Sequence, residues 1–243
     1  MNWMTSKIEK LNIFIRLLFS HRMGLTGFSV ICLFVLMAIF ASLLGTVDPG
    51  RTGEAENILK SPSSSFWLGT DDLARDIWSQ TIYGSRISLT VGLVAALITV
   101  VSGTLVGLVA GFYGKIVEEA LMRIVDFFMM LPELPLMIVL AAVLGPSMWN
   151  IILVVSLVSW PTTARVVRSQ VLSLKERPFV EASRCIGAGS LRLMFGEILP
   201  NVVPLMFAQA VIMITEAIYA EAVLSFLGLG DPTSISWGTV SYT

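Results

Sequence analysis

Long apolar runs alternate with polar segments along this chain of 243 residues. A helix needs roughly 20 apolar residues to cross about 30 Å of hydrocarbon. Runs of about this length lie at about 24–45, 88–112, 124–144, 149–165 and 201–228. Pro132 and Pro135 interrupt the third run, but the polar loops on both sides support it as a span. The pattern predicts an all-α integral membrane protein, a polytopic bundle with about five spans.

The composition supports the same class. Hydrophobic residues make up 55% of the chain and charged residues 14%, and the mean hydropathy is +0.82. A net charge of −1 gives no reason to expect a nucleic-acid partner. The single histidine, His21, and the two distant cysteines, Cys32 and Cys185, predict neither a metal site nor a disulfide.

The runs divide the chain into four parts. We predict a cytoplasmic N-terminal segment at 1–23, a first transmembrane helix at 24–45, an extracytoplasmic loop at 46–87 and a core domain of the remaining spans at 88–243. The first run follows a basic segment and has a weak cleavage pattern at 38–41, as a signal peptide would. Its length of about 22 residues exceeds the apolar region of a typical signal peptide and favours an uncleaved span.

The loop charges predict the orientation. Segments 1–23, 113–123 and 165–200 hold twelve lysines and arginines, whereas the alternating segments 46–87, 145–148 and 229–243 hold four. The cytoplasmic side of a membrane protein is the more basic one. The N-terminus is therefore predicted to be cytoplasmic, in a multi-pass protein of the plasma (inner) membrane. Five spans would leave the end of the chain outside.

A ridge of small residues follows one face of the second run. Gly103, Gly107 and Gly111 continue the four-residue spacing of Ala95 and Thr99. Small residues allow close helix packing in lipid, where the hydrophobic drive for association is weak. The ridge predicts packing, either against a helix of this chain or against a second membrane subunit.

Four carboxylates lie in apolar runs: Asp126, Glu133, Glu216 and Glu221. Such a charge costs about 2.5–3.5 kcal/mol at mid-bilayer, so it usually faces a cavity or a partner. Arg123 is three residues before Asp126, which predicts an ion pair, and Glu221 should lie near the outer end. Glu133 and Glu216 remain as candidates for a translocation pathway. The alternative for both is a structural hydrogen bond.

The extracytoplasmic loop contains the acidic sequence 70–76. Its spacing does not match a regular calcium-binding loop. Thr70 is instead predicted to cap a helix, with Asp71 and Asp72 in its first turn.

The polar segment 165–200 contains six cations between two apolar runs. Ser173 and Glu176 have the spacing of a capping box, and Pro178 then fits a first helical turn. The predicted helix covers about 176–186 and ends at Gly187. One stripe of that helix is apolar or small: Phe179, Ala182, Ser183 and Ile186. Such a helix either lies on the membrane surface or inserts into a groove of another protein, and the small central residues favour the groove.

Glu181-Ala182-Ser183, then Gly187, then Ile198-Leu199-Pro200 resembles the EAA loop of permease subunits in binding-protein-dependent ABC importers. Other motifs resemble the C-type permeases of the dipeptide/oligopeptide/nickel family: Leu68-Gly69-Thr70-Asp71-Asp72, Tyr83-Gly84-Ser85-Arg86, Leu224-Ser225-Phe226-Leu227-Gly228 and Ser236-Trp237-Gly238. The chain departs from that pattern at Ala74, Ser183 and Glu133, because a glycine, an alanine and a small or polar residue are usual there.

The resemblance implies a type I importer permease bundle. It implies docking to the ATPases through Phe179, Glu181, Ala182, Ser183, Ile186, Gly187, Ile198, Leu199 and Pro200. The implied partners are a second permease subunit in a heterodimer, two ATP-binding-cassette ATPases and an extracytoplasmic substrate-binding protein. This chain has no P-loop, so ATP and magnesium are expected on the ATPases, with no cofactor or enzyme activity on this chain.

The implied cargo is peptide, with nickel chelates or oligosaccharides as further options. The family has six spans, so we expect the five-span chain to be a truncated form. The main alternative is an ion-coupled secondary transporter that uses Glu133 and Glu216. A non-transporting membrane scaffold is a third interpretation, which the docking segment disfavours.

Overall fold

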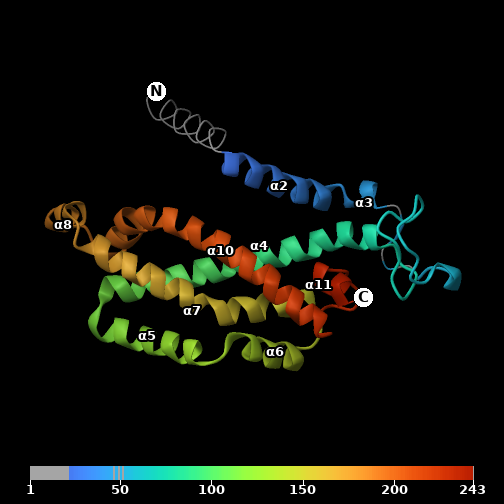
Figure 1. Cartoon of the computed structure of the whole chain (residues 1–243). Coiled ribbons are helices and arrows are strands. Elements are labelled where there is room, and N and C mark those ends of the chain that lie inside the picture. The colour runs from blue at the N-terminus through green and yellow to red at the C-terminus, as the bar shows by residue number, and fades with distance from the viewer. Residues whose placement is uncertain (1–21, 46, 49, 51, 243) are drawn as a thin grey trace.

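The computed structural model describes residues 22–45, 47, 48, 50 and 52–242 (Figure 1). His21 and most of the basic N-terminal segment fall outside the described residues. The described elements are α2 (Arg22–Ile39), α3 (Ala41–Leu44), η1 (Ala55–Asn57), α4 (Ile77–Tyr113), α5 (Lys115–Met130), α6 (Glu133–Leu144), α7 (Met148–Lys175), α8 (Pro178–Cys185), α9 (Ser190–Arg192), η2 (Leu193–Ile198), α10 (Leu199–Phe226) and α11 (Trp237–Tyr242). Within them, β-type pairing is limited to an isolated bridge between Thr70 and Asp76, which confirms the all-α prediction.

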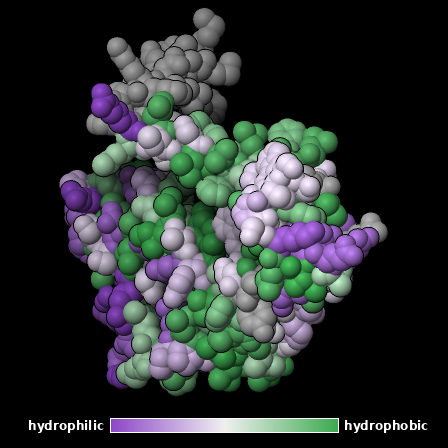
Figure 2. All heavy atoms as spheres, turned by 45° about the vertical axis from the view of Figure 1, so that its right-hand side comes forward, coloured by the Kyte–Doolittle hydropathy of each residue, from purple (hydrophilic) through white to green (hydrophobic). Residues whose placement is uncertain are grey.

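Four described helices are long and apolar enough to span a membrane. They are α2, α4, α7 and the continuous helical stretch 190–226 that ends in α10. The third predicted span is instead a pair, α5 and α6, bent by 88° at Leu131 and Pro132. Counting the pair as one span gives five. Hydrophobic residues cover much of the face seen in Figure 2, as expected of a chain surrounded by lipid.

The centre of the bundle is a close pairing of α4 and α7, which α10 crosses (Figure 1). The three glycines of the ridge face α7 of the same chain. A Cβ atom added to Gly107 would lie 2.5 Å from the Ala164 carbonyl oxygen, and one added to Gly103 would lie 2.8 Å from that of Trp160. The ridge therefore serves packing within this chain.

Helix α4 begins later than the predicted cap at Thr70. Its N-cap is Asp76, whose carboxylate accepts a hydrogen bond from Ser79 N at 3.0 Å. Thr70 is used in the preceding loop, where its hydroxyl accepts from Lys60 N at 2.8 Å. The chain then turns through Ala74 at φ 57°, so residues 70–75 cannot form the first turn of a helix.

Asp71 organises this turn from a buried position. Arg75 Nε and Gln80 Nε2 both donate to its Oδ2, at 2.7 and 2.9 Å. Burial raises the pKa of Asp71, but hydrogen bonds from the Arg75 backbone, Gln80 and the Arg75 side chain outweigh it, and the net pKa is below its usual value. Asp71, which was predicted to lie in a first helical turn, instead holds the loop against α4.

The ion pair predicted between Arg123 and Asp126 is wrong. Arg123 pairs with Glu119 at 2.8 Å, and Asp126 pairs with Arg165 of α7 at 2.5 Å. A glutamate four residues before an arginine is a favourable helical pair, and Asp126 is turned toward α7. Glu118 is also paired with Arg168 of α7. Two ion pairs thus join α5 to α7.

At the opposite end of the bundle, Glu221 joins α10 to α4. Its side chain is buried and accepts hydrogen bonds from Ser88 at 2.9 Å and Ser225 at 2.7 Å. Trp237 N of α11 donates to the same Ser88 hydroxyl at 3.2 Å, and the Trp237 ring contacts Phe34 of α2. Helix α2 is thereby attached near this end, and it diverges from the bundle toward its N-terminal end in Figure 1.

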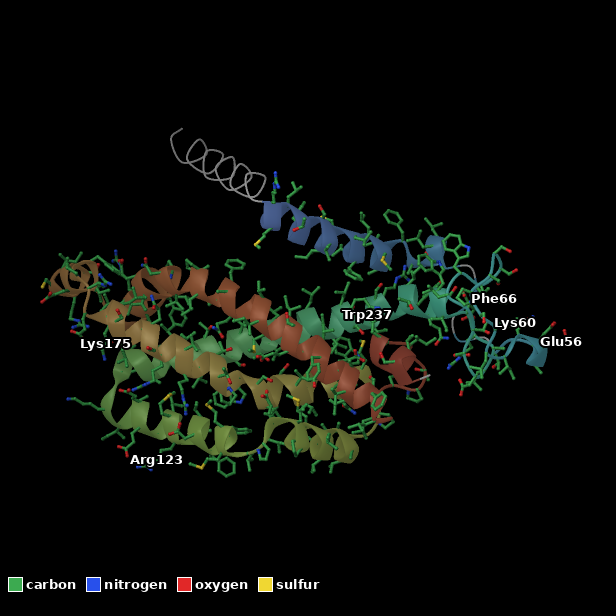
Figure 3. All side chains as sticks on the ribbon, in the orientation of Figure 1. Glu56, Lys60, Phe66, Arg123, Lys175 and Trp237 are labelled. Atoms are coloured by element: carbon green, nitrogen blue, oxygen red, sulfur yellow. The ribbon has the colours of Figure 1, made fainter. Side chains whose placement is uncertain are left out.

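The two ends of the bundle allow a direct test of orientation. In Figure 3, Lys175 lies at one end and Glu56, Lys60 and Phe66 at the other. We predict that a cysteine replacing Ser64 reacts with an impermeant thiol reagent in intact cells, whereas one replacing Ser190 reacts only after permeabilisation. Both positions are exposed. The background should carry Cys185→Ser, because Cys185 is itself an exposed thiol. The reverse labelling pattern would overturn the cytoplasmic placement of α8.

Candidate functional site

Helix α8 is a short helix at the tip of the bundle, set off from α7 by a sharp turn (Figure 1). The capping box predicted at Ser173 and Glu176 is wrong, because α7 continues through Ser173 to Lys175. The continuation packs Leu174 against the buried cluster that contains Val171 and Val180, and this packing outweighs a local cap. Arg177 is the N-cap residue of α8, and Pro178 occupies its first turn as predicted. Proline fits there because no intrahelical N–H bond is needed.

Gly187 ends this helix in the left-handed conformation, with φ of 89°. The N–H of Ala188 donates to the Ser183 carbonyl at 3.0 Å, a bond typical of a Schellman motif. A Cβ atom at position 187 would meet no atom within 4 Å, so backbone conformation rather than space favours glycine here.

Two contacts attach α8 to the adjoining end of the bundle. Val180 is fully buried in a cluster with Val171, Leu193 and Ile198. The Ser183 hydroxyl donates to Glu197 Oε1 at 3.2 Å. Leu193 to Ile198 form the π-helical segment η2, which leads directly into α10. The sequence did not predict the anchoring role of Val180, because this residue lies beside the predicted stripe.

The predicted docking residues divide into an outer and an inner group. Phe179, Glu181, Ala182 and Gly187 are exposed, as is Ile186, of which 80% is accessible. Ser183 is half-buried on its bond to Glu197, and Pro200 is exposed at the base of α10. Ile198 is fully buried and Leu199 is half-buried. These last two residues support the loop from behind and offer a partner little surface.

The two candidate pathway carboxylates lie in one cavity of about 230 Å³. Glu133 is the first residue of α6, and Glu216 lies in the middle of α10. Ser159 of α7 donates to Glu133 Oε1 at 2.9 Å. Tyr219 of α10 also lines the cavity, with Leu134, Met137 and Ala220. Ser159 and Tyr219 could not be predicted from the sequence, because a serine and a tyrosine in apolar helices give no spacing signal.

The exposure of Glu216 limits which surroundings this face of α10 can have. Glu216 lies on the open side of α10, and the part of the chain that the structure describes forms no hydrogen bond or ion pair with its carboxylate. Lipid contact would cost about 2.5–3.5 kcal/mol for a charge at this depth. This face of α10 therefore suits water, a partner subunit or a polar cargo. Within the described residues no cluster of histidine, cysteine, aspartate or glutamate could hold a metal ion.

Comparison with known proteins decides the family. The profile of a family described as "Binding-protein-dependent transport system inner membrane component" matches residues 103–241, and one described as "N-terminal TM domain of oligopeptide transport permease C" matches residues 11–62. The first match covers α7, α8, α10 and the cavity. The chain belongs to this family of inner membrane permease components.

Individual members of the family are similar over most of the chain. The oligopeptide transport system permease protein OppC of Bacillus subtilis is 39% identical over 223 residues, covering 91% of this chain and 73% of the relative. The dipeptide transport system permease protein DppC of Alkalihalophilus pseudofirmus is 38% identical over 219 residues, covering 90% and 72%. The di/tripeptide transport system permease protein DppC of Pseudomonas aeruginosa is 38% identical over 231 residues, covering 91% and 76%.

The family gives the chain its role. It is a multi-pass membrane permease of a binding-protein-dependent transport system, with a part in the translocation path. The relatives are transport permeases, and the ion-coupled carrier considered from the sequence is not favoured.

Proposed function

We propose that this chain is the C-type permease subunit of an ABC importer for peptides. The names of three relatives, which refer to oligopeptides, dipeptides and di/tripeptides, support a peptide cargo over nickel chelates or oligosaccharides. The complete importer would contain a second, different permease subunit, two ATPase subunits and an extracytoplasmic binding protein. ATP and magnesium would bind to the ATPases, and this chain would catalyse no reaction. The complex would sit in the plasma (inner) membrane with the N-terminus of this chain in the cytoplasm.

The exposed face of α8 is the proposed ATPase-docking surface. The single observation that carries this proposal is an apolar side chain, Ile186, that is 80% exposed at the C-cap of α8, while Val180 anchors the other side of this helix. A soluble partner with an apolar groove would remove Ile186, Phe179 and Ala182 from water, which is favourable. Glu181 on the same helix would favour a partner that places a basic side chain opposite its carboxylate.

Because α8 is anchored to the bundle, docking at α8 can move α10. Val180 and Ser183 attach α8 to η2, and η2 continues into α10. A displacement of α8 by closing ATPases would therefore move the base of α10. Glu216 lies further along the same helix, in the cavity that it shares with Glu133. We propose that these two carboxylates line the pathway of the cargo.

The experiment is reconstitution of the importer in vesicles. With both permease subunits, the ATPases and a loaded binding protein present, we expect uptake of a labelled tripeptide that requires ATP. Omission of the ATPases should abolish it even under a proton or sodium gradient. Gradient-driven uptake without ATPases would overturn the proposal in favour of an ion-coupled carrier.

The pathway assignment has its own test in the same assay. Glu216→Gln and Glu133→Gln should each change tripeptide uptake severalfold, because they alter the charge that a passing cargo meets, and should leave the yield of assembled complex unchanged. Glu119→Gln is the matched control, since Glu119 is an exposed glutamate of α5 outside the cavity. Wild-type uptake in both cavity variants would remove these residues from the pathway.

A further inference from the structure

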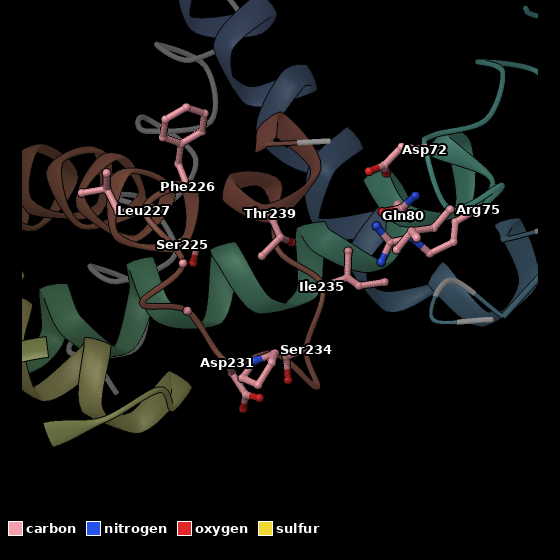
Figure 4. A pocket seen from close by; sticks show the side chains of 14 residues that line it. Asp72, Arg75, Gln80, Ser225, Phe226, Leu227, Asp231, Ser234, Ile235 and Thr239 are labelled. Atoms are coloured by element: carbon pink, nitrogen blue, oxygen red, sulfur yellow. The ribbon is translucent and has the colours of Figure 1, made fainter. Parts of the chain in front are cut away.

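A second cavity, of about 420 Å³, opens at the end of the bundle opposite α8, which the proposed orientation makes extracytoplasmic. Its walls come from residues 72–80 and from residues 225–239, where α10 ends and α11 begins. In Figure 4, Asp72, Arg75 and Gln80 lie together on one side, and Phe226 and Leu227 lie on the opposite side. The volume falls within the range of about 300–1,000 Å³ that is usual for small-ligand sites.

The polar side of this cavity has hydrogen-bonding groups left free. Gln80 is 2% exposed and donates through Nε2 to Asp71, while its carbonyl oxygen accepts no hydrogen bond from the described residues. Arg75 uses Nε for Asp71, and its two Nη groups have no partner within the described chain. Asp72 adds an exposed carboxylate. The wall thus offers donors, an acceptor and a negative charge within a single cluster.

Asp71 fixes this cluster in place. Hydrogen bonds keep the pKa of Asp71 below its usual value despite its burial. The carboxylate therefore stays ionised at neutral pH and pairs with the positive charge of Arg75. The Gln80 amide is oriented by the same carboxylate, through its Nε2 bond of 2.9 Å. The free groups of Arg75 and Gln80 are consequently held in position before any ligand arrives.

The cavity also lies in line with the membrane cavity. Phe226 follows Tyr219 by seven residues along α10. Seven residues are close to two helical turns, so the two side chains share a face at about 10 Å separation along the axis. Tyr219 lines the cavity of Glu133 and Glu216, and Phe226 lines the outer one. One face of α10 therefore connects the two.

We propose that the outer cavity is an entry site that binds the cargo peptide before it reaches the membrane cavity. This inference rests on the proposed function as a peptide importer. The protonated amino terminus and a backbone N–H would bind Asp72 and the Gln80 carbonyl oxygen. A peptide carbonyl or the terminal carboxylate would accept from Arg75. An apolar side chain would pack on Phe226 and Leu227, opposite the polar cluster.

Photo-crosslinking tests the proposal directly. The probe is the tripeptide alanyl-p-benzoylphenylalanyl-alanine, added to the purified complex of permeases and ATPases in nanodiscs without binding protein. After illumination, labelled fragments are mapped by mass spectrometry. We expect labels within 225–235 or 72–80 of this chain, and competition by unlabelled Ala-Leu-Ala. Asp72→Asn should weaken labelling about tenfold, equivalent to about 1.4 kcal/mol, whereas the exposed loop control Glu56→Gln should not.

A chemical variant of the competitor tests the contact with Asp72. N-acetylated Ala-Leu-Ala should compete about tenfold less well than the free peptide against the wild-type complex, because it lacks the positive amino terminus. In Asp72→Asn the two competitors should be equal, since the coupling between ligand charge and residue charge is gone. The same tenfold difference in both complexes would overturn the assigned contact.

The outcomes separate this inference from the proposed function. ATP-dependent tripeptide uptake with no label in either segment would overturn the entry site alone. Labelling of these segments that appears only after a binding protein is added would show that the cavity does not bind the peptide by itself, and it would also overturn the entry site. A wild-type complex that imports no peptide under any loading would overturn the proposed function itself. Labelling as expected, with the Asp72→Asn loss, would establish the site.

Discussion

Replacing Gly107 with valine should prevent the chain from accumulating as a folded bundle. A Cβ atom at this position would lie 2.5 Å from the Ala164 carbonyl oxygen and 2.9 Å from Arg168 N, both backbone atoms of α7. A side chain can rotate away from a clash, but a helix backbone can only move as a whole. The cost should therefore exceed the about 1–3 kcal/mol of ordinary core overpacking. The measurement is the yield of monodisperse protein after detergent extraction, together with its thermal unfolding.

Gly27→Val is the matched control. Gly27 also lies inside a predicted membrane helix, α2, but an added Cβ atom there would meet nothing within 4 Å. Both variants make the same change in helix propensity, so only the contact with α7 differs. Equal yields and unfolding temperatures for the two would contradict the tight α4–α7 packing.

Glu181→Lys should abolish transport and stimulated ATP hydrolysis while the protein inserts at wild-type level. Glu181 is exposed on α8, so its replacement leaves the fold intact. The substitution places a cation opposite the cationic group that the proposed partner presents to Glu181. Like-charge contacts at an interface cost several kcal/mol. The measurements are ATPase subunits retained on the purified permease and ATP-dependent uptake. Glu176→Lys, at an exposed position just before α8, is the control and should retain both.

The turn after α8 allows a second form of the same test. Gly187 and Gly189 are both surrounded by open space, but only Gly187 has a positive φ. Valine at 187 should cost about 1–2 kcal/mol of local strain and misplace the proposed docking helix, whereas valine at 189 should be tolerated. Wild-type ATPase retention in Gly187→Val as well as Glu181→Lys would refute the docking assignment.

Features set by composition and local backbone chemistry were predictable from the sequence. Apolar length placed the spans, and Pro178 and Gly187 placed the start and end of α8, because proline and glycine act through their own dihedral angles. The glycine ridge gave a packing face, but the sequence could not say which helix it meets.

Features that depend on tertiary contacts were not predictable. Asp126 pairs with Arg165, 39 residues away, rather than with nearby Arg123. Thr70 appeared to be a good helix cap, but its hydroxyl is engaged by Lys60 across the loop. The bend of 88° between α5 and α6 was also missed. Pro132 marked its position, but the angle is set by how each half packs against α7.

The sequence identified Glu133 and Glu216 together as candidates for the pathway, but it gave no sign that they line one cavity. Their sharing of a cavity follows from the packing of α6, α7 and α10.

The π-helical segment η2 has a consequence for how the chain tolerates insertions and deletions. Hydrogen bonds in a π-helix join residues five apart, so this turn accommodates one residue more than an α-helical turn. One residue corresponds to a rotation of about 100° in an α-helix. The six residues of η2 therefore set the angular phase between the surface that holds α8 and the face that carries Glu216 and Phe226. Loss of a single residue from η2 would leave the sequence of α10 unchanged. It would nevertheless rotate the α10 residues that line both cavities by about 100° relative to the surface that holds α8.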